Sequence, residues 1–300
     1  MTSVPAPAAE RAIAAPRSPR IQPALIVTAI CFAVLFAKPA GLLLKDWWTN
    51  PEAGHGLLLA PVAFWLAWKK GLLESYRPAP ALGLSLLVFA ILVRGIADLA
   101  AELFTMRASL VLASLALIIY FRGVRQAAAW WLPIVLLALS IPLPELVTSS
   151  IALPLQFKAS ALGTRLLEWR GVPVLLSGNV IQIPGHQLFV TEACSGLRSL
   201  NALLALAVLM GGLWFQYPAT RLLLIAVAVP VAILINGVRV FLTGFLVYFV
   251  DPKLGEGFMH LTEGWLLFLV SLTLIGLTAL GFRLLERGLF RRTREAGNAE

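Results

Sequence analysis

Residues 221–249 read RLLLIAVAVPVAILINGVRVFLTGFLVYF, a run in which Arg221 and Arg239 are the only charged side chains. A helix that crosses a bilayer needs about 17–25 mostly apolar residues, so this run is long enough to span. The composition of the whole chain agrees, because 59% of its 300 residues are hydrophobic and only 13% are charged, against about 25% charged residues in soluble domains. Mean hydropathy is +0.87. The sequence therefore predicts an all-α polytopic membrane protein.

Further apolar runs lie on both sides of this one, and together they predict about eight transmembrane helices. The predicted ranges are 21–44, 54–68, 81–97, 106–121, 127–143, 197–214, 221–249 and 262–283. The first is too long for the apolar core of a signal peptide and is interpreted as an uncleaved signal anchor. Residues 1–20, rich in Ala and Pro, are expected to form a disordered cytoplasmic tail. Residues 284–300 are expected to form a basic cytoplasmic tail, which leaves 21–283 as the transmembrane domain.

The positions of Lys and Arg predict the orientation. With the N-terminus in the cytoplasm, the inner segments carry 14 of the 24 Lys and Arg residues, whereas the short outer loops carry few. The positive-inside rule therefore places both termini in the cytoplasm. The net charge of +9 is explained by this topology, so the lipid bilayer is an expected partner and nucleic acid is not.

The long outer segment, residues 144–196, is the least membrane-like part of the chain. Between residues 149 and 169, apolar residues alternate with Gln156, Lys158, Arg165 and Glu168, which favours a helix lying in the membrane interface. Between residues 174 and 190, strand-like residues surround turn signals at 177–179 and 184–185. This pattern predicts a small extracytoplasmic β-hairpin that leads into the segment TEACSG, residues 191–196.

Ionisable groups at membrane depth are costly, so each is a functional candidate. Cys194 stands just before the predicted sixth span, at its outer end. Arg239 follows Arg221 by 18 residues, which is about 27 Å along a helix at 1.5 Å per residue. His260 precedes the eighth span on the outer side. The topology thus predicts that a thiol, a guanidinium and an imidazole meet at one depth of the outer leaflet.

These three groups are sufficient for acyl transfer. A helix N-terminus directly after Cys194 and the charge of Arg239 both favour the thiolate, which is the reactive form of cysteine. His260 can take up a proton and later donate it to a leaving amine, and Arg239 can also stabilise an oxyanion. Cys31 and Cys194 form no CxxC or Cys/His cluster, so the sequence indicates no metal site and no cofactor.

Four further residues are candidate auxiliaries, and each has a structural alternative. His55, in a Gly-His-Gly triplet, either lines the site or caps the second helix. Asn236 either holds the guanidinium or packs between helices. Arg198 either shares the cationic role or contacts lipid headgroups, and Glu263 either orients the imidazole from one helical turn away or lies at the surface.

A second class of function is a membrane transporter or polysaccharide-export component. In that case Arg94, Arg198, Arg239 and His260 would line a polar path. Such a protein is expected to contain an internal repeat with paired broken helices. The sequence has no clear repeat, which favours the enzyme.

Several motifs carry a family resemblance. Residues 192–200 read EACSGLRSL, residues 236–239 read NGVR, and His260 precedes Glu263 in HLTEGW. His55-Gly56 with the following helix, IPLP at 141–144 and GNVI at 178–181 extend the similarity over about residues 47–283. In this order the motifs resemble the exosortase/archaeosortase family of multispanning membrane cysteine transpeptidases or proteases.

The resemblance implies a triad in which Cys194 is the nucleophile and Arg239 and His260 complete the site. It implies that the substrates are PEP-CTERM proteins, whose C-terminal sorting signal is a short motif followed by a transmembrane helix and a basic cluster. A Cys194 thioacyl intermediate at the periplasmic side of a bacterial inner membrane is then expected. Whether water or an amine resolves it, and which exosortase subtype this is, stay open.

Overall fold

The computed structural model describes residues 23–50, 52–190, 197–255 and 257–297. The chain divides into two compact units, residues 1–38 and 39–300. In the first unit, the described residues form the N-terminal part of helix α1 (Pro23–Thr49), in which the rings of Phe32 and Phe36 are 4.9 Å apart. All elements discussed below belong to the second unit.

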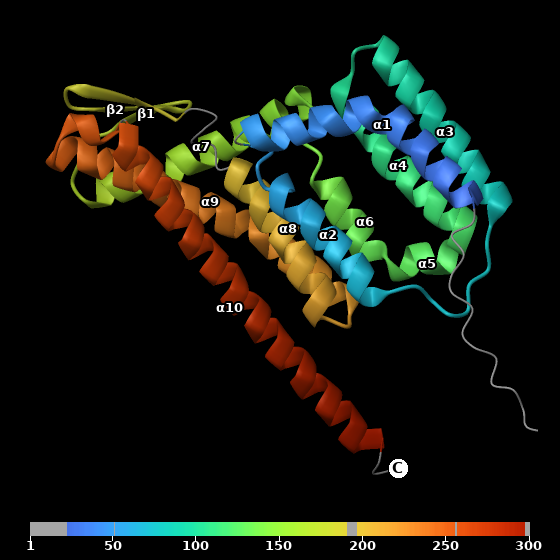
Figure 1. Ribbon diagram of the computed structural model, residues 1–300. Coiled ribbons are helices and arrows are strands. Elements are labelled where there is room, and N and C mark those ends of the chain that lie inside the picture. Colours follow the sequence, from blue (N-terminus) through green and yellow to red (C-terminus); the bar gives the residue numbers. More distant parts are fainter. Residues whose placement is uncertain (1–22, 51, 191–196, 256, 298–300) are drawn as a thin grey trace, which may run out of the picture. The chain divides into compact units, whose positions relative to one another are not determined.

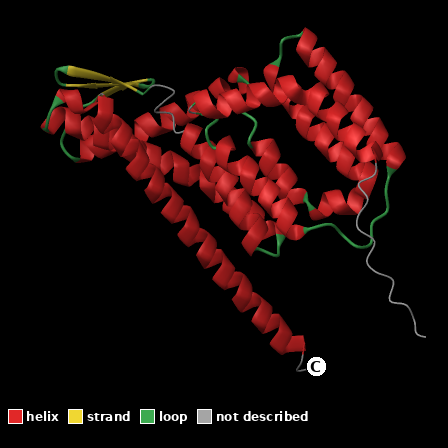
Figure 2. Ribbon diagram, viewed as in Figure 1, coloured by secondary structure: helices red, strands yellow, loops and turns green. Residues whose placement is uncertain are grey.

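The described part of the second unit consists of helices and one small sheet (Figure 2). Its helices after α1 are α2 (Gly56–Lys70), α3 (Pro80–Leu99), α4 (Leu103–Arg122), α5 (Val124–Ala129), α6 (Trp131–Leu139), α7 (Glu145–Trp169), α8 (Leu197–Trp214), α9 (Pro218–Phe249) and α10 (Gly257–Gly297), with a 3₁₀ turn at Pro252–Gly255 (Figure 1). The prediction of an all-α membrane protein is confirmed at this level. Because α10 continues to Gly297, residues 284–297 of the predicted tail are helical.

Among the described residues, five helices are long and apolar enough to cross a membrane, and eight spans are therefore not confirmed. The five ranges are 25–49, 80–99, 103–122, 218–249 and 266–288. At 54–68 the structure has α2, whose 15 residues extend about 22 Å, short of the roughly 30 Å of a hydrocarbon core. The run at 127–143 is divided into α5 and α6 at Trp130. Pro133 explains this break, because it has no N–H to donate to the carbonyl of Ala129.

The segment that was expected to be a hairpin is a three-stranded antiparallel sheet. Its strands are β1 (Leu175–Ser177), β2 (Val180–Ile183) and β3 (His186–Phe189), in that order. The two predicted turn signals lie at the two chain reversals, where Gly178 and Gly185 have φ values of 64° and 79°. Each signal thus makes its own turn, and two turns give three strands instead of two.

Helix α7 buries small and polar residues. Lys158, Arg165 and Glu168 are exposed as predicted, but Gln156 is 4% exposed, so its placement on the polar face was wrong. The buried set of this helix is Ala152, Leu155, Gln156, Ala159, Ser160, Gly163, Thr164 and Leu167. Small residues allow close helix contact, so this face suits packing against another helix better than it suits lipid.

The partner of this face is α9, and the contact is close. The contacting pairs are Leu162 with Gly237, Gly163 with Val240, and Leu167 with Gly244. A Cβ atom added to any of these glycines would lie 2.4–2.8 Å from the partner side chain, so glycine is required for the approach. Because the pairs advance in the same order along both helices, α7 and α9 run in the same direction.

Helix α9 also packs against α8 and α10 (Figure 1). A short connection makes α8 and α9 antiparallel neighbours, with Gly211 facing Arg221. On α10, Ser271, Ile275 and Ala279 are buried at four-residue spacing, the period of one helix face. At the start of α9 the buried carboxylate of Glu286 accepts hydrogen bonds from the backbone N–H groups of Gln216 and Tyr217, each at 3.3 Å. Helix α9 is therefore held by α7, α8 and α10.

Candidate active site

Arg239 lies in α9 on the stripe that faces α8 and α10. Ala228 and Ala232 belong to the core cluster that these helices share, and Arg239 follows Ala232 by seven residues, about two helical turns. The side chain is half-buried, with its Nε atom buried. The hydroxyl of Thr243 donates a hydrogen bond to the Arg239 carbonyl at 3.0 Å. Asn236, one turn earlier, is 4% exposed. Both candidate residues of α9 therefore lie in the helix-packed part of the molecule.

Cys194 lies outside the described residues. Of the other candidates, Arg198 is the second residue of α8, and His260 and Glu263 lie in the first two turns of α10. For these three residues the structure describes the backbone and not the side chains.

The register of α8 on α9 shows which part of α9 the N-terminus of α8 reaches. The two helices are antiparallel, with Gly211 facing Arg221, and both rise about 1.5 Å per residue. Stepping back along α8 from this contact brings Leu200 level with Ala232, in agreement with their shared core cluster. Three residues further, Leu197, the first residue of α8, is level with Ile235. The N-terminus of α8 therefore lies within about one turn of Arg239 along the axis of α9.

The chain that leads toward Cys194 is fixed at Val190. The N–H of Val190 donates to the carbonyl of Asn179 at 3.0 Å, and the Asn179 Nδ2 donates to the carbonyl of Val190 at 3.1 Å. The same amide donates to Oε1 of Gln156 on α7 at 3.3 Å. Sequence reasoning used Asn179 only as part of a turn and a motif. The sequence did contain a sign of this contact. Gln156 is a long polar residue on a helix face of mostly small residues, and a buried amide there requires a hydrogen-bond partner.

His55 connects two backbone segments. Its Nδ1 is 3.0 Å from the carbonyl oxygen of Glu52, and its Nε2 is 3.1 Å from the carbonyl oxygen of Leu139 at the end of α6. His55 stands at the N-cap position of α2, as one of the two alternatives expected, but its side chain makes no capping hydrogen bond to that helix. The ring holds the α1–α2 loop against α6.

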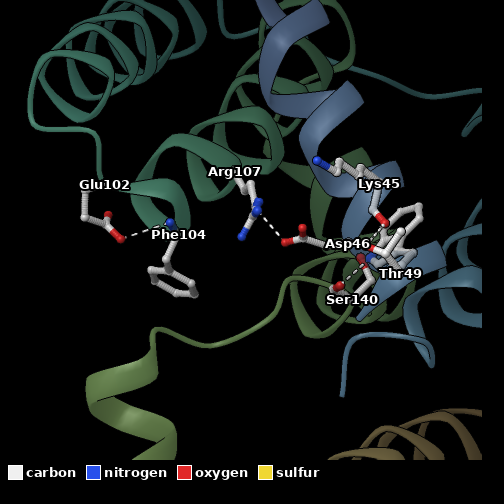
Figure 3. Close-up of polar contacts among 8 residues, drawn as sticks. Lys45, Asp46, Thr49, Glu102, Phe104, Arg107 and Ser140 are labelled. Atoms are coloured by element: carbon white, nitrogen blue, oxygen red, sulfur yellow. Dashed lines mark hydrogen bonds and ion pairs between the residues drawn. The ribbon is translucent and has the colours of Figure 1, made fainter. Parts of the chain in front are cut away.

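A polar network at the same loop was missed by sequence reasoning (Figure 3). The Trp47 indole N–H donates to the Ser140 carbonyl at 2.7 Å. Arg107, from α4, forms an ion pair with Asp46 near the end of α1, and the Arg107 side chain is 6% exposed. A basic residue inside a predicted span, Arg107, was a signal that sequence reasoning did not use.

A separate set of hydrogen bonds caps the N-terminus of α4. The Glu102 carboxylate accepts hydrogen bonds from the N–H groups of Phe104 and Thr105 at 2.9 and 2.6 Å. Hydrogen bonding from Thr105 is the main cause that holds the pKa of Glu102 below its usual value, and the Phe104 N–H and the charge of Arg107 add to it. Glu102 is thus an ionised cap of this helix.

Within the described ranges, no group of three or more His, Cys, Asp or Glu residues is placed to hold a metal ion.

Comparison with known families gives one finding. The family model described as transmembrane exosortase matches residues 47–277, a range that includes all seven candidate residues. No curated protein and no solved structure matches the chain.

Proposed function

The chain belongs to the transmembrane exosortase family, and from this membership we propose that it is a membrane cysteine peptidase or transpeptidase. Its proposed substrates are exported proteins with a C-terminal sorting signal of the PEP-CTERM type. The proposed nucleophile is Cys194, with Arg239 and His260 as its partners.

The observation that carries the proposal is the position of Arg239 beside the N-terminus of α8. Cys194 precedes that N-terminus by three residues. A cation and the positive end of a helix macrodipole at the same level both favour a thiolate over a thiol.

The spacing along α10 supports the role of His260. His260 precedes the buried Ser271 by eleven residues, which is close to three helical turns. It therefore belongs to the stripe of Ser271, Ile275 and Ala279, the stripe that packs toward α8 and α9. Such a position suits a general acid and base at the outer end of the helices.

In the proposed reaction, the Cys194 thiolate attacks the carbonyl carbon of the scissile peptide bond. The oxyanion that forms is stabilised by the Arg239 guanidinium and by backbone N–H groups at the start of α8. The C–N bond then breaks as His260 donates a proton to the leaving amine, which departs with the C-terminal helix of the substrate. Water or an acceptor amine attacks the thioacyl carbon, His260 takes its proton, and Cys194 leaves as the thiolate.

The remaining candidates are proposed as positioning residues. Asn236 lies one turn from Arg239 and is placed to orient the guanidinium. Glu263 follows His260 by three residues, the spacing of neighbours on one helix face. Arg198 adds positive charge at the start of α8. His55 fixes the loop before α2 through the contacts described above.

The proposed location follows from the charge distribution. With both termini in the cytoplasm of a bacterium, the N-terminus of α8 and the C-terminal part of α9 lie at the periplasmic side of the inner membrane. A substrate with a transmembrane C-terminal helix would present its scissile bond at that level.

The test is co-expression with a reporter that carries a PEP-CTERM tail from the same genome, followed by intact mass measurement. We expect the wild type and Cys31→Ala to remove the tail and Cys194→Ala to leave it in place. The mass remaining on the new C-terminus would distinguish hydrolysis from transfer to an amine. Undiminished cleavage by a folded Cys194→Ala protein would overturn the thiol mechanism.

A further inference from the structure

Two buried hydroxyls on α7 have no hydrogen-bond partner among the described residues. They belong to Ser160 and Thr164, which are 0% and 5% exposed. The other buried hydroxyls that the structure describes, on Ser109, Ser140 and Ser271, each donate to a carbonyl three or four residues earlier at 2.6–2.9 Å. The α7 pair thus differs from comparable groups in the same protein.

This difference has an energetic meaning. A Ser or Thr in a helix can bond to the carbonyl of the preceding turn. A buried hydroxyl that leaves its bond unmade loses its hydration without recovering it. Buried polar groups without partners are rare in native proteins, and one explanation is a ligand that supplies the missing bond.

The contact between α7 and α9 defines the side on which these hydroxyls lie. Leu162 faces Gly237 at one edge of the buried surface of α7, and Gly163 faces Val240 near its centre. Around the circumference of α7, Leu162 is followed by Gly163, and Gly163 is followed by Ser160. Thr164 lies one turn after Ser160 on the same side of the helix.

The same step around α9 leads to Arg239. Around the circumference of α9, Gly237 is followed by Val240, and Val240 is followed by the polar residues Asn236, Thr243 and Arg239. The hydroxyl pair and the Arg239 guanidinium therefore border the same side of the α7–α9 contact. Because the helices run in the same direction and Gly163 is level with Val240, Thr164 lies within about one turn of Arg239 along the axis.

We propose that the hydroxyls of Ser160 and Thr164 bind the main chain of the substrate next to the cleaved bond. Residues four apart on a helix are separated by about 6 Å along its axis. In an extended peptide, carbonyl groups that point the same way recur every two residues, about 6.6 Å apart. The two donors therefore match two alternate carbonyl oxygens of an extended segment, whatever its side chains.

This inference rests on the proposed function and adds its substrate-binding surface. Neutral hydroxyls suit a main chain, since they donate to a carbonyl without requiring a charged partner. Because the two hydroxyl oxygens are buried, the substrate must displace the side chains that cover them, and the two new hydrogen bonds offset part of that cost.

The test uses Ser160→Ala, Thr164→Val and the double variant in the full-length protein. Each removes a hydroxyl that has no partner among the described residues, so thermal stability should stay the same or rise. Cleavage of the reporter should fall about tenfold for each variant, the factor expected for one lost hydrogen bond to the substrate. Capture of uncleaved reporter by the Cys194→Ala protein should weaken in parallel.

Matched variants separate this role from a structural one. Ser109→Ala removes a buried hydroxyl that is already bonded, so it should lower stability slightly and leave cleavage unchanged. Thr164→Ser keeps the donor and should retain cleavage even if Thr164→Val does not fold. Wild-type cleavage by the double variant, or equal losses in Thr164→Ser and Thr164→Val, would overturn this inference alone. Absence of cleavage by the wild type would overturn the proposed function and this inference with it.

Discussion

Asn179 and Val190 exchange two hydrogen bonds. The Val190 N–H donates to the Asn179 carbonyl at 3.0 Å, and the Asn179 side-chain amide donates to the Val190 carbonyl at 3.1 Å. Since the same amide also contacts Gln156 on α7, the end of the sheet is joined to the helix that packs against α9. Val190 stands four residues before Cys194, so this pair fixes the chain on one side of the proposed nucleophile.

We predict that Asn179→Asp impairs cleavage more than it impairs folding. Aspartate keeps the size of the side chain but loses the N–H donors, which leaves the Val190 carbonyl and Gln156 Oε1 without them. Loss of a buried hydrogen bond of this kind costs about 1–3 kcal/mol. Thermal unfolding and reporter cleavage should be measured together, with Gln187→Glu on the exposed side of β3 as the control. Equal cleavage by Asn179→Asp and the control would contradict a role in positioning Cys194.

Arg239→Lys should abolish most cleavage although it keeps the positive charge. Lysine lacks the planar fork of arginine and places a point charge elsewhere. Loss of one oxyanion donor typically lowers kcat by about 100-fold or more, so the reporter should remain mostly uncleaved at comparable protein levels. Arg165→Lys, on the exposed face of α7, is the matched control and should cleave normally. An Arg239→Lys protein with a kcat near the wild-type value would exclude Arg239 from the reaction.

The Glu102 cap predicts an acid-sensitive contribution to stability. Its pKa is lowered in the folded protein, mainly through Thr105, so the folded state binds this proton less readily than the unfolded chain. The contribution is therefore present above the ordinary pKa of about 4.5 and is lost as pH falls through the lowered folded value. In a Glu102→Gln protein, thermal stability should decline less steeply below pH 4.5. Parallel curves for the wild type and Glu102→Gln would show that the carboxylate does not contribute.

The sequence predicted what depends on local spacing and missed what depends on contacts between distant segments. One long apolar run predicted a single helix that carries both Arg221 and Arg239, and α9 is that helix. The break at Trp130 was missed because the span at 127–143 was predicted from hydropathy alone. Hydropathy does not show that Pro133 has no N–H to donate within a helix. Similarly, the contact of Gln156 with Asn179 joins residues 23 positions apart, and no periodicity within one helix encodes it.

The ion pair of Asp46 and Arg107 should stabilise the folded protein through mutual neutralisation of two charges. Arg107 is 6% exposed and Asp46 is 27% exposed, so Asp46→Asn would leave a buried guanidinium without its counter-charge. Removal of one partner of a buried pair costs about 3–5 kcal/mol, and the partial exposure of Asp46 places this case at the lower end.

Replacing both residues, as Asp46→Asn with Arg107→Met, should restore much of the loss, because no charge then remains buried. Unfolding of the wild type, both single variants and the double variant gives the coupling energy directly. If the losses of the two single variants simply add in the double variant, the two charges do not interact, and their attraction does not hold the end of α1 to α4.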